Sequence, residues 1–261
     1  MSDAPAEERA AEPRRPRFAF AGRPEKVLGL ALLAVALLGI VAILLGLLLW
    51  PDGTDGGSRR ASGPLAGRQN ATLDVDDGIG AVRVRAADMD DLYRITVPAG
   101  SGVRPRVDRD DGEVRLHLAP ANNGNNDPGT VDITVNKGVA WILRINGGTR
   151  QTVIDMSGGK LDEIDLGGGS SQVELTLPAP SRVVPVRMTA GVDQFAVRLP
   201  VNTPVRVTFG SGAGRATLDG TTHQGIGPGS SFTANGWGQT NTGIDIQAQA
   251  GVGSLSVDQI Q

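Results

Sequence analysis

The stretch Gly167–Leu177, GGGSSQVELTL, places three glycines and two serines directly before a segment in which apolar and polar residues alternate. A glycine-rich loop of this kind can hold a phosphate or can simply reverse the chain. A phosphate-binding loop carries a Lys followed by Ser or Thr and opens into a helix, whose N-terminus holds the anion. Gly167–Leu177 has no Lys, and its alternation is typical of a β-strand with one buried face. We therefore interpret it as a turn that leads into a strand.

The same strand–turn–strand unit recurs along the chain. Gly147, Gly168, Gly191 and Gly212 are 21, 23 and 21 residues apart, and a fixed period in this range is typical of stacked repeats. On both sides of the turns, Val, Leu and Ile alternate with polar residues, which predicts that one face of every strand is buried. The turns that define the repeat are DGIGA, NGGTRQ, GGGSSQ, TAGVDQ, GSGAGR and AQAGVGS.

Residues 71–261 are therefore expected to be all-β, and two architectures fit their pattern. In a β-solenoid, each repeat of about 21–23 residues is one coil, which stacks on the coils before and after it through parallel strands. In an antiparallel β-sandwich each unit is a hairpin, and hairpins favour two-residue turns such as Asn-Gly. The turns here are longer and the period is steadier than a sandwich requires, so we predict the solenoid. Residues 221–243 lengthen the last repeat and are interpreted as an insertion.

The N-terminal part of the chain predicts a membrane anchor. Val27–Trp50 contains no charged residue and is long enough to cross the hydrocarbon layer as a helix. A cleavable signal peptide has a shorter apolar region and a small-residue cleavage site, whereas this run ends in LLLWPDG. Arg and Lys are concentrated before the run, which places the N-terminus in the cytoplasm. We expect a single-pass cell-membrane protein whose C-terminal domain is extracytoplasmic.

These patterns divide the chain into four parts. Residues 1–26 are rich in Pro, Ala and charge, so they are expected to form a disordered cytoplasmic tail. Residues 27–50 are the transmembrane helix, and residues 51–70 form a flexible linker of Gly, Ser, Pro and Asp. Residues 71–261 form the extracytoplasmic β-repeat domain.

The sequence offers little catalytic or metal-binding chemistry. The chain has no Cys, which excludes disulfides and thiolate ligands. His117 is expected to face water and His223 to lie in a loop, so neither a zinc site nor a catalytic triad is predicted. The acidic clusters at 74–77, 88–91 and 108–111 offer oxygen ligands for calcium, but Asp also favours turns by bonding its own backbone. We expect no catalytic residue, no metal and no cofactor.

A row of charges provides a prediction about register. Arg144, Asp165 and Arg187 occupy outward positions before three successive turns. If the coils stack in register, these side chains alternate in sign up one face of the stack. Each exposed pair would then contribute at most about 1 kcal/mol to stability.

Four turns carry a resemblance to a known family: DGIGAVRV, GGGSSQVELTLP, AGVDQFAVRLP and AGVGSLSV. With the N-terminal span, these β-repeats resemble the bacterial toast-rack, or putative-adhesin, domain family of unknown function. They also resemble the C-terminal domains of cell-wall-antibiotic-response membrane proteins. The likeness covers residues 71–261. It implies a right-handed β-solenoid-like fold at the cell envelope, and the family offers no catalytic residues.

The expected function is that of a non-catalytic envelope module, which acts as a scaffold, an adhesin-like binder or an envelope-stress regulator. The alternative is a β-helix enzyme that acts on cell-surface polysaccharide. Aromatic residues make up 3% of the chain and offer few platforms on which sugars could stack, so we favour the non-enzyme.

The expected partners are the lipid bilayer, through residues 27–50, and an unidentified envelope protein or glycan. Ala42 and Gly46 form a small-residue pair that would allow two spans to self-associate. The net charge of −3 disfavours nucleic acid and strong polyanions. Trp237, in ANGWGQTN, is either an exposed contact for a partner or a cap on the core.

Overall fold

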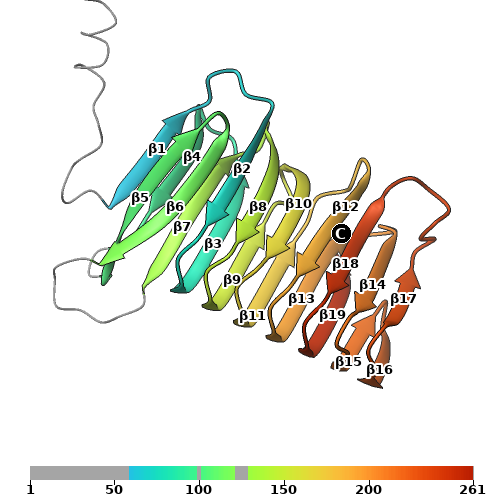
Figure 1. The fold of residues 1–261 in the computed structure, drawn as a ribbon. Helices are drawn as coiled ribbons and strands as arrows, with labels where there is room; N and C mark the ends of the chain where they lie inside the picture. Colours follow the sequence, from blue (N-terminus) through green and yellow to red (C-terminus); the bar gives the residue numbers. More distant parts are fainter. Residues whose placement is uncertain (1–58, 99–100, 121–128, 261) are drawn as a thin grey trace, which may run out of the picture. The chain divides into compact units, whose positions relative to one another are not determined.

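The computed structural model describes residues 59–98, 101–120 and 129–260, all of which belong to a compact unit that spans Asp55–Gln261. Every regular element in these ranges is a β-strand (Figure 1). None of the described residues forms a helix with the length and apolarity needed to span a bilayer. The tail expected at 1–26 and the span expected at 27–50 lie outside the described residues.

The strands form two sheets, which we call sheet A and sheet B (Figure 1). Sheet A has ten strands, and its outermost strand β1 lies inside the segment 51–70 that was expected to be a linker. In hydrogen-bonded order, the strands of sheet A are β1 (Arg60–Pro64), β4 (Asp91–Thr96), β7 (Thr130–Asn136), β3 (Ile79–Ala87), β9 (Thr149–Asp155), β11 (Ser170–Thr176), β13 (Val192–Pro200), β19 (Val252–Ile260), β15 (Ala213–Leu218) and β16 (Thr221–Ile226).

Sheet B has nine strands. Each of its parallel strands is followed in sequence by a strand of sheet A, and we call such a pair of strands a coil. The coils come in the same order in both sheets. In hydrogen-bonded order, the strands of sheet B are β17 (Ser230–Ala234), β14 (Val205–Phe209), β18 (Gly243–Ala248), β12 (Val183–Met188), β10 (Lys160–Leu166), β8 (Ala140–Ile145), β2 (Asn70–Val75), β6 (Glu113–Pro120) and β5 (Val103–Asp110).

Both sheets are mixed, with parallel strands in the middle and antiparallel strands at the ends. A glycine-containing turn leads from each of β2, β8, β10, β12, β14 and β18 in sheet B to the strand that follows it in sheet A. Gly167–Gly169 is one of these turns, between β10 and β11, and the segment after it is a strand as predicted. Antiparallel pairing is confined to β1, β4 and β5 at one end and β16 and β17 at the other.

The order of the coils departs from the expectation that each coil stacks on the previous one. β18 and β19 lie between the coil of β12 and β13 and the coil of β14 and β15. At the other end, β2 and β3 lie between the coil of β6 and β7 and the coil of β8 and β9. At the C-terminal end, the chain forms the outer coil of β14 and β15 first and then returns to fill the position inside it. At the N-terminal end it forms β2 and β3 first, adds β6 and β7 outside them, and then continues with β8 and β9 on the inner side.

Extra strands pair with the outer coil at each end of the stack. Residues 221–243, interpreted above as an insertion, contain β16 and β17, which pair antiparallel with the outer coil. At the other end, β4 and β5 pair antiparallel with the outer coil, and β1 pairs with β4 to form the edge of sheet A. These antiparallel strands end the parallel ladders, and short edge strands and proline are devices by which natural sheets limit edge-to-edge association. Proline in the edge strands β1 and β5 reinforces this at the first end.

The core lies between the two sheets and consists of aliphatic columns. The inward residues Leu143 in β8 and Ile164 in β10 are fully buried, as are Leu175 in β11 and Val197 in β13. The alternating apolar residues of these strands therefore face the core, as the sequence pattern predicts. Inward residues of sheet A and sheet B join in one continuous hydrophobic cluster.

The glycines at the turns allow neighbouring coils to approach closely. A Cβ atom on Gly168 would lie 2.1 Å from the carbonyl oxygen of Gly147, and a Cβ atom on Gly147 would lie 2.1 Å from the carbonyl oxygen of Asp77. Neither glycine has a positive φ, so an unusual backbone conformation is not what selects it. Glycine is required at these two positions because the corner of one coil rests on the corner of the next.

Candidate functional site

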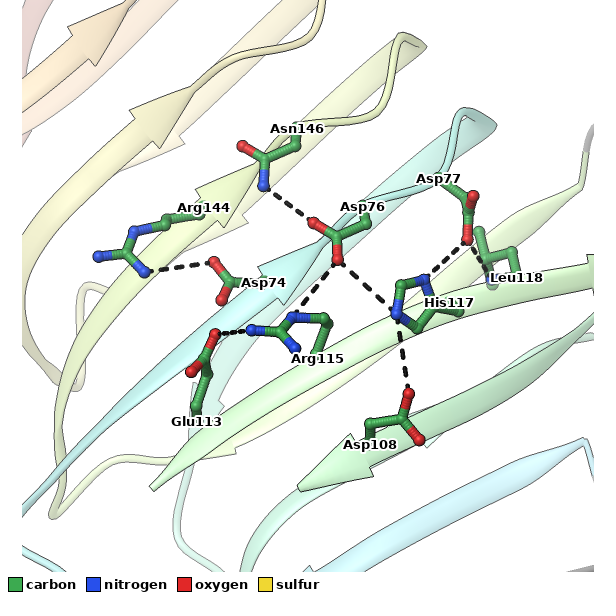
Figure 2. Close-up of polar contacts among 10 residues, drawn as sticks. All are labelled: Asp74, Asp76, Asp77, Asp108, Glu113, Arg115, His117, Leu118, Arg144 and Asn146. Carbon is green, nitrogen blue, oxygen red and sulfur yellow. Dashed lines mark hydrogen bonds and ion pairs between the residues drawn. The ribbon is translucent and has the colours of Figure 1, made fainter. Parts of the chain in front are cut away.

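Charged side chains gather on the outer face of sheet B, over β2, β6 and β8 (Figure 2). Asp74 of β2 is in register with Arg115 of β6 and Arg144 of β8, so a carboxylate lies between two guanidinium groups. The side chain of Asp74 is only 6% exposed, and its Oδ1 lies 3.7 Å from a terminal nitrogen of Arg144. Arg115 pairs with the neighbouring Glu113 and lies 3.7 Å from Asp76.

Asp74 is the carboxyl group that this environment perturbs most clearly. Burial and a hydrogen bond shared with Glu113 raise the pKa of Asp74 from 3.8 to about 6, although the charge of Arg144 acts in the opposite direction. The same hydrogen bond, together with Arg115, lowers the pKa of Glu113. When the pair holds one proton, that proton resides on Asp74, and Oδ1 of Asp74 accepts no hydrogen bond from the residues that the structure describes.

His117 of β6 lies among three carboxylates that come from two separate parts of the chain (Figure 2). Its ring nitrogens lie 3.4 Å from Asp77 and 3.8 Å from both Asp76 and Asp108. Asp76 also accepts a hydrogen bond from the side chain of Asn146 at 3.0 Å. His117 is thus partly exposed, in agreement with the sequence pattern, but the pattern did not reveal that two acidic clusters meet around it.

The Asp-Gly dipeptide at 111–112 is the signal that could have predicted this meeting. It closes the hairpin of β5 and β6, and Asp-Gly is among the strongest short hairpin signals. Once that hairpin is assigned, Asp108 and His117 must lie on neighbouring strands. The third acidic cluster, 88–91, lies elsewhere and contributes an ion pair between Asp88 and Lys137 at 2.7 Å.

The register predicted for the charged row on sheet B is confirmed. Asp165 of β10 is directly opposite Arg144 of β8 on one side and Arg187 of β12 on the other. The ion pairs involve other carboxylates: Arg144 pairs with Asp74, which lies opposite it on β2, and Arg187 pairs diagonally with Glu163 on β10. The row therefore shows that β8, β10 and β12 stack in register, although Arg144 and Arg187 pair with carboxylates other than Asp165.

A second polar group lies on β14 and β18, and it includes Trp237. Arg206 donates two hydrogen bonds to Asp245, at 2.8 and 2.7 Å. Burial opposes ionisation of Asp245, but hydrogen bonds from Arg206 and Gln247 outweigh it and lower the pKa of Asp245. The guanidinium of Arg206 lies 4.9 Å from the ring centroid of Trp237, in a cation–π arrangement.

Trp237 is half-buried rather than fully exposed. In addition to its contact with Arg206, its ring lies so close to Gly243 that a Cβ atom there would be 2.7 Å from the indole. These two contacts account for its half-buried position, and neither of them is with a residue of the hydrophobic core. A contact between Trp237 and a partner stays a prediction.

His223 lies in strand β16, not in the loop that was expected. Its ring contacts the ring of Phe232 in β17, with centroids 4.3 Å apart, and Phe232 contacts Phe209 at 6.2 Å. β16 belongs to sheet A and β17 to sheet B, so this stack of rings joins the two sheets at the end of the core. The Gly- and Thr-rich composition concealed two short edge strands.

The outer face of sheet A carries an open hollow of about 340 Å³ over β11, β13, β19 and β15. Its floor consists of small side chains on the two central strands, Ala196, Ser254 and Ser256. Larger side chains stand on both sides of the floor. On β11 these are Gln172 and Glu174, and on β15 they are Arg215 and Thr217.

The polar groups of this hollow fall into two sets. Glu174 is bound within the protein, because it accepts hydrogen bonds from Gln172 at 2.8 Å and from Arg198 at 3.2 Å. By contrast, the side chains of three residues make no hydrogen bond or ion pair with the described part of the protein. These residues are Gln194 on β13, Ser256 on β19 and Arg215 on β15.

These three unbonded groups lie on three adjacent strands, which are about 4.8 Å apart in any sheet. A concave surface with a few convergent polar groups is the usual form of a ligand site. We therefore take the hollow on sheet A as the candidate binding site. The sequence did not predict it, because β19 must first be placed between β13 and β15.

A second hollow, of about 420 Å³, lies on sheet B and is lined by the acidic residues Asp110, Asp111, Glu113 and Asp162. Asp162 already forms an ion pair with Arg182 at 2.7 Å. Among the residues that the structure describes, no group of three or more His, Asp or Glu side chains is arranged to hold a metal ion.

Comparison with known proteins gives a likeness of fold. No family model and no curated protein matches the chain. A crystal structure described as a "putative cell adhesion protein" from Clostridium sporogenes ATCC 15579 aligns with a TM-score of 0.58 and 19% identity, over 77% of this chain and 98% of that chain. A "putative adhesin" from Bacteroides fragilis NCTC 9343 aligns with a TM-score of 0.26 and 11% identity, over 76% of this chain and 95% of that chain. At 19% identity, the first alignment shows a shared fold.

Proposed function

We propose that this protein is an adhesin-like binder of the cell envelope, anchored in the membrane by residues 27–50. In this proposal, the two sheets are the faces of a right-handed β-solenoid, which presents its outer surfaces to the exterior of the cell. The protein binds its ligand without changing it chemically. Any role as a scaffold or in signalling envelope stress would follow from this binding.

The hollow on sheet A is the observation that carries this proposal. It is open, and it presents an amide, a hydroxyl and a guanidinium that no described residue engages. The surrounding sheet is held by parallel ladders and a continuous core, so these groups are presented on a rigid surface. The likeness in fold to the Clostridium protein supports the proposal, since that protein is described as a cell adhesion protein.

A binding assay with the whole protein tests the proposal. The labelled full-length chain, in nanodiscs, is incubated with intact bacterial cells and with isolated cell-wall glycan, and bound label is measured against competition by unlabelled protein. We expect saturable, competable binding and no release of soluble sugar. Absence of saturable binding would contradict the adhesin-like role, and release of sugar products would favour the polysaccharide-degrading alternative.

A pair of substitutions connects the binding to the hollow. Ser256→Tyr places a large side chain on the floor of the hollow, whereas Thr134→Tyr introduces the same side chain at a half-buried position on β7, outside the hollow. We expect Ser256→Tyr to abolish binding to cells and Thr134→Tyr to preserve it. Equal binding by the two variants would place the binding surface elsewhere.

A further inference from the structure

We propose that the hollow on sheet A binds a saccharide that carries a carboxylate, with Arg215 as the residue that recognises the acidic group. This inference rests on the proposed adhesin-like function and names the chemical class of its ligand. It depends on the charges and hydrogen-bonding groups that the hollow leaves available.

Arg215 provides the charge. Its side chain is exposed at the edge of the hollow, and its guanidinium has no ion-pair partner among the described residues. Arg198 also lines the hollow, but Glu174 binds it at 3.2 Å, so the two charges offset each other. The hollow therefore offers one unmatched positive charge, and the planar fork of an arginine matches a carboxylate with two parallel hydrogen bonds.

Gln194 and Ser256 provide groups suited to sugar hydroxyls. The side-chain amide of Gln194 both donates and accepts hydrogen bonds, and so does the hydroxyl of Ser256. Both residues line the hollow beside Arg215, on strands that follow one another in the sheet. An acidic sugar presents hydroxyls next to its carboxylate, so its hydroxyls can bond Gln194 and Ser256 while its carboxylate bonds Arg215.

The apolar lining disfavours a peptide as the ligand. Val173, Phe195 and Leu255 contribute to the lining, but all three side chains point into the core and are at most 2% exposed. A peptide normally binds through buried aromatic or aliphatic anchors, or by adding a strand to a sheet edge. The hollow lies within the sheet and offers neither an apolar pocket nor an edge.

Direct binding measurements on the full-length protein in nanodiscs test this inference. The probes are oligogalacturonate, its methyl ester, a hyaluronan oligosaccharide and an oligoglutamate peptide. We expect binding to a carboxylated saccharide, together with a loss of about 10-fold or more on methyl esterification, because a charge-assisted hydrogen bond is lost. No binding to either carboxylated saccharide would overturn the inference, as would tighter binding to oligoglutamate.

A matched pair of arginine variants assigns the interaction to the hollow. Arg215→Ala should weaken binding of the carboxylated saccharide by about 10- to 100-fold and should leave the methyl ester unaffected. Arg150→Ala removes another exposed arginine of sheet A, on β9 and outside the hollow, and should have no effect. Equal losses in the two variants would contradict a specific role for Arg215.

The outcomes also separate this inference from the proposed function. If wild-type protein and Arg215→Ala bind cells equally well, the adhesin-like role stands and the assigned ligand class is wrong. If wild-type protein binds neither cells nor cell-wall glycan, the proposed function itself is wrong.

Discussion

Replacing Gly168 with Ala should disturb the contact between two neighbouring coils. The added methyl carbon would lie 2.1 Å from the carbonyl oxygen of Gly147, and the next nearest backbone atoms lie 2.4 and 2.8 Å away. All three atoms belong to the backbone of the adjacent coil, so no side chain can rotate to make room. The coils must separate at this corner, against the parallel hydrogen bonds that join β11 to β9 and β10 to β8.

The size of the effect follows from this overlap. Side-chain overpacking in protein cores costs about 1–3 kcal/mol, and here the obstacle is backbone rather than a flexible side chain. The Gly→Ala change also reduces the entropy of the unfolded chain, which stabilises the folded state by about 0.4–1 kcal/mol. With the cost at the upper end of its range, we expect a net loss of about 2 kcal/mol in the free energy of unfolding.

Urea unfolding followed by circular dichroism measures the loss, and the adjacent glycine provides the control. A Cβ atom on Gly169 would lie 3.6 Å from its nearest neighbour, the carbonyl oxygen of Gly191, which is an ordinary contact. Gly169→Ala should therefore change the free energy of unfolding by less than about 1 kcal/mol in either direction. If Gly168→Ala is no less stable than Gly169→Ala, close stacking of the coils at this corner is refuted.

Three further predictions concern the polar clusters and the end of the core. The raised pKa of Asp74 means that this carboxyl binds a proton more tightly in the folded state than in the unfolded state, so the contribution of Asp74 to stability falls as pH rises from about 4 to about 6. Asp74→Asn should remove this fall, so that its free energy of unfolding exceeds that of wild type by about 1–3 kcal/mol above pH 7 and shows no advantage near pH 4. Urea unfolding across pH measures the difference, and parallel pH profiles for the two proteins would contradict the prediction. Asp165→Lys should destabilise the protein by about 1 kcal/mol at low salt, because three positive charges then stand in register, and high salt should reduce the loss; no loss at low salt would count against the register. Phe232→Ala should lower stability by about 2 kcal/mol in thermal unfolding, because it removes the ring that joins Phe209 to His223 across the sheets, and an unchanged midpoint would show that this end of the core does not depend on it.

Local features of the fold could be predicted from the sequence. Alternation in the strands identified the inward residues, and the absence of a Lys and a helix signal after Gly167 identified a turn rather than a phosphate site. The spacing of the repeats even gave the register of Asp165 between Arg144 and Arg187. These features depend on residues within one repeat or on the constant length of the repeat.

The order of the coils could not be predicted in the same way. Equivalent strands of different coils carry similar patterns, so β13 can accept either β15 or β19 as its neighbour on pattern alone. The choice between these two neighbours depends on the placement of β16 and β17 at the sheet edges. Their polar, glycine-rich sequences resemble a loop, so the sequence pattern does not identify them as strands. The hollow and the cluster around His117 both depend on such long-range neighbours, which explains why neither was predicted.

Cysteine cross-linking tests most directly the placement of β19 between β13 and β15, on which the candidate binding site depends. The natural chain has no Cys, so an introduced pair reports only its own proximity. Ala196 of β13 is in register with Ser256 of β19, and Ser256 is in register with Thr217 of β15. Strands about 4.8 Å apart satisfy the Cα separation of a disulfide, whereas strands two positions apart do not. The variant with Cys at 196 and 256 should therefore form an intramolecular disulfide on mild oxidation, and the variant with Cys at 196 and 217 should not. Efficient cross-linking of 196 to 217, without cross-linking of 196 to 256, would show that the coils stack in chain order and that the hollow does not exist as described.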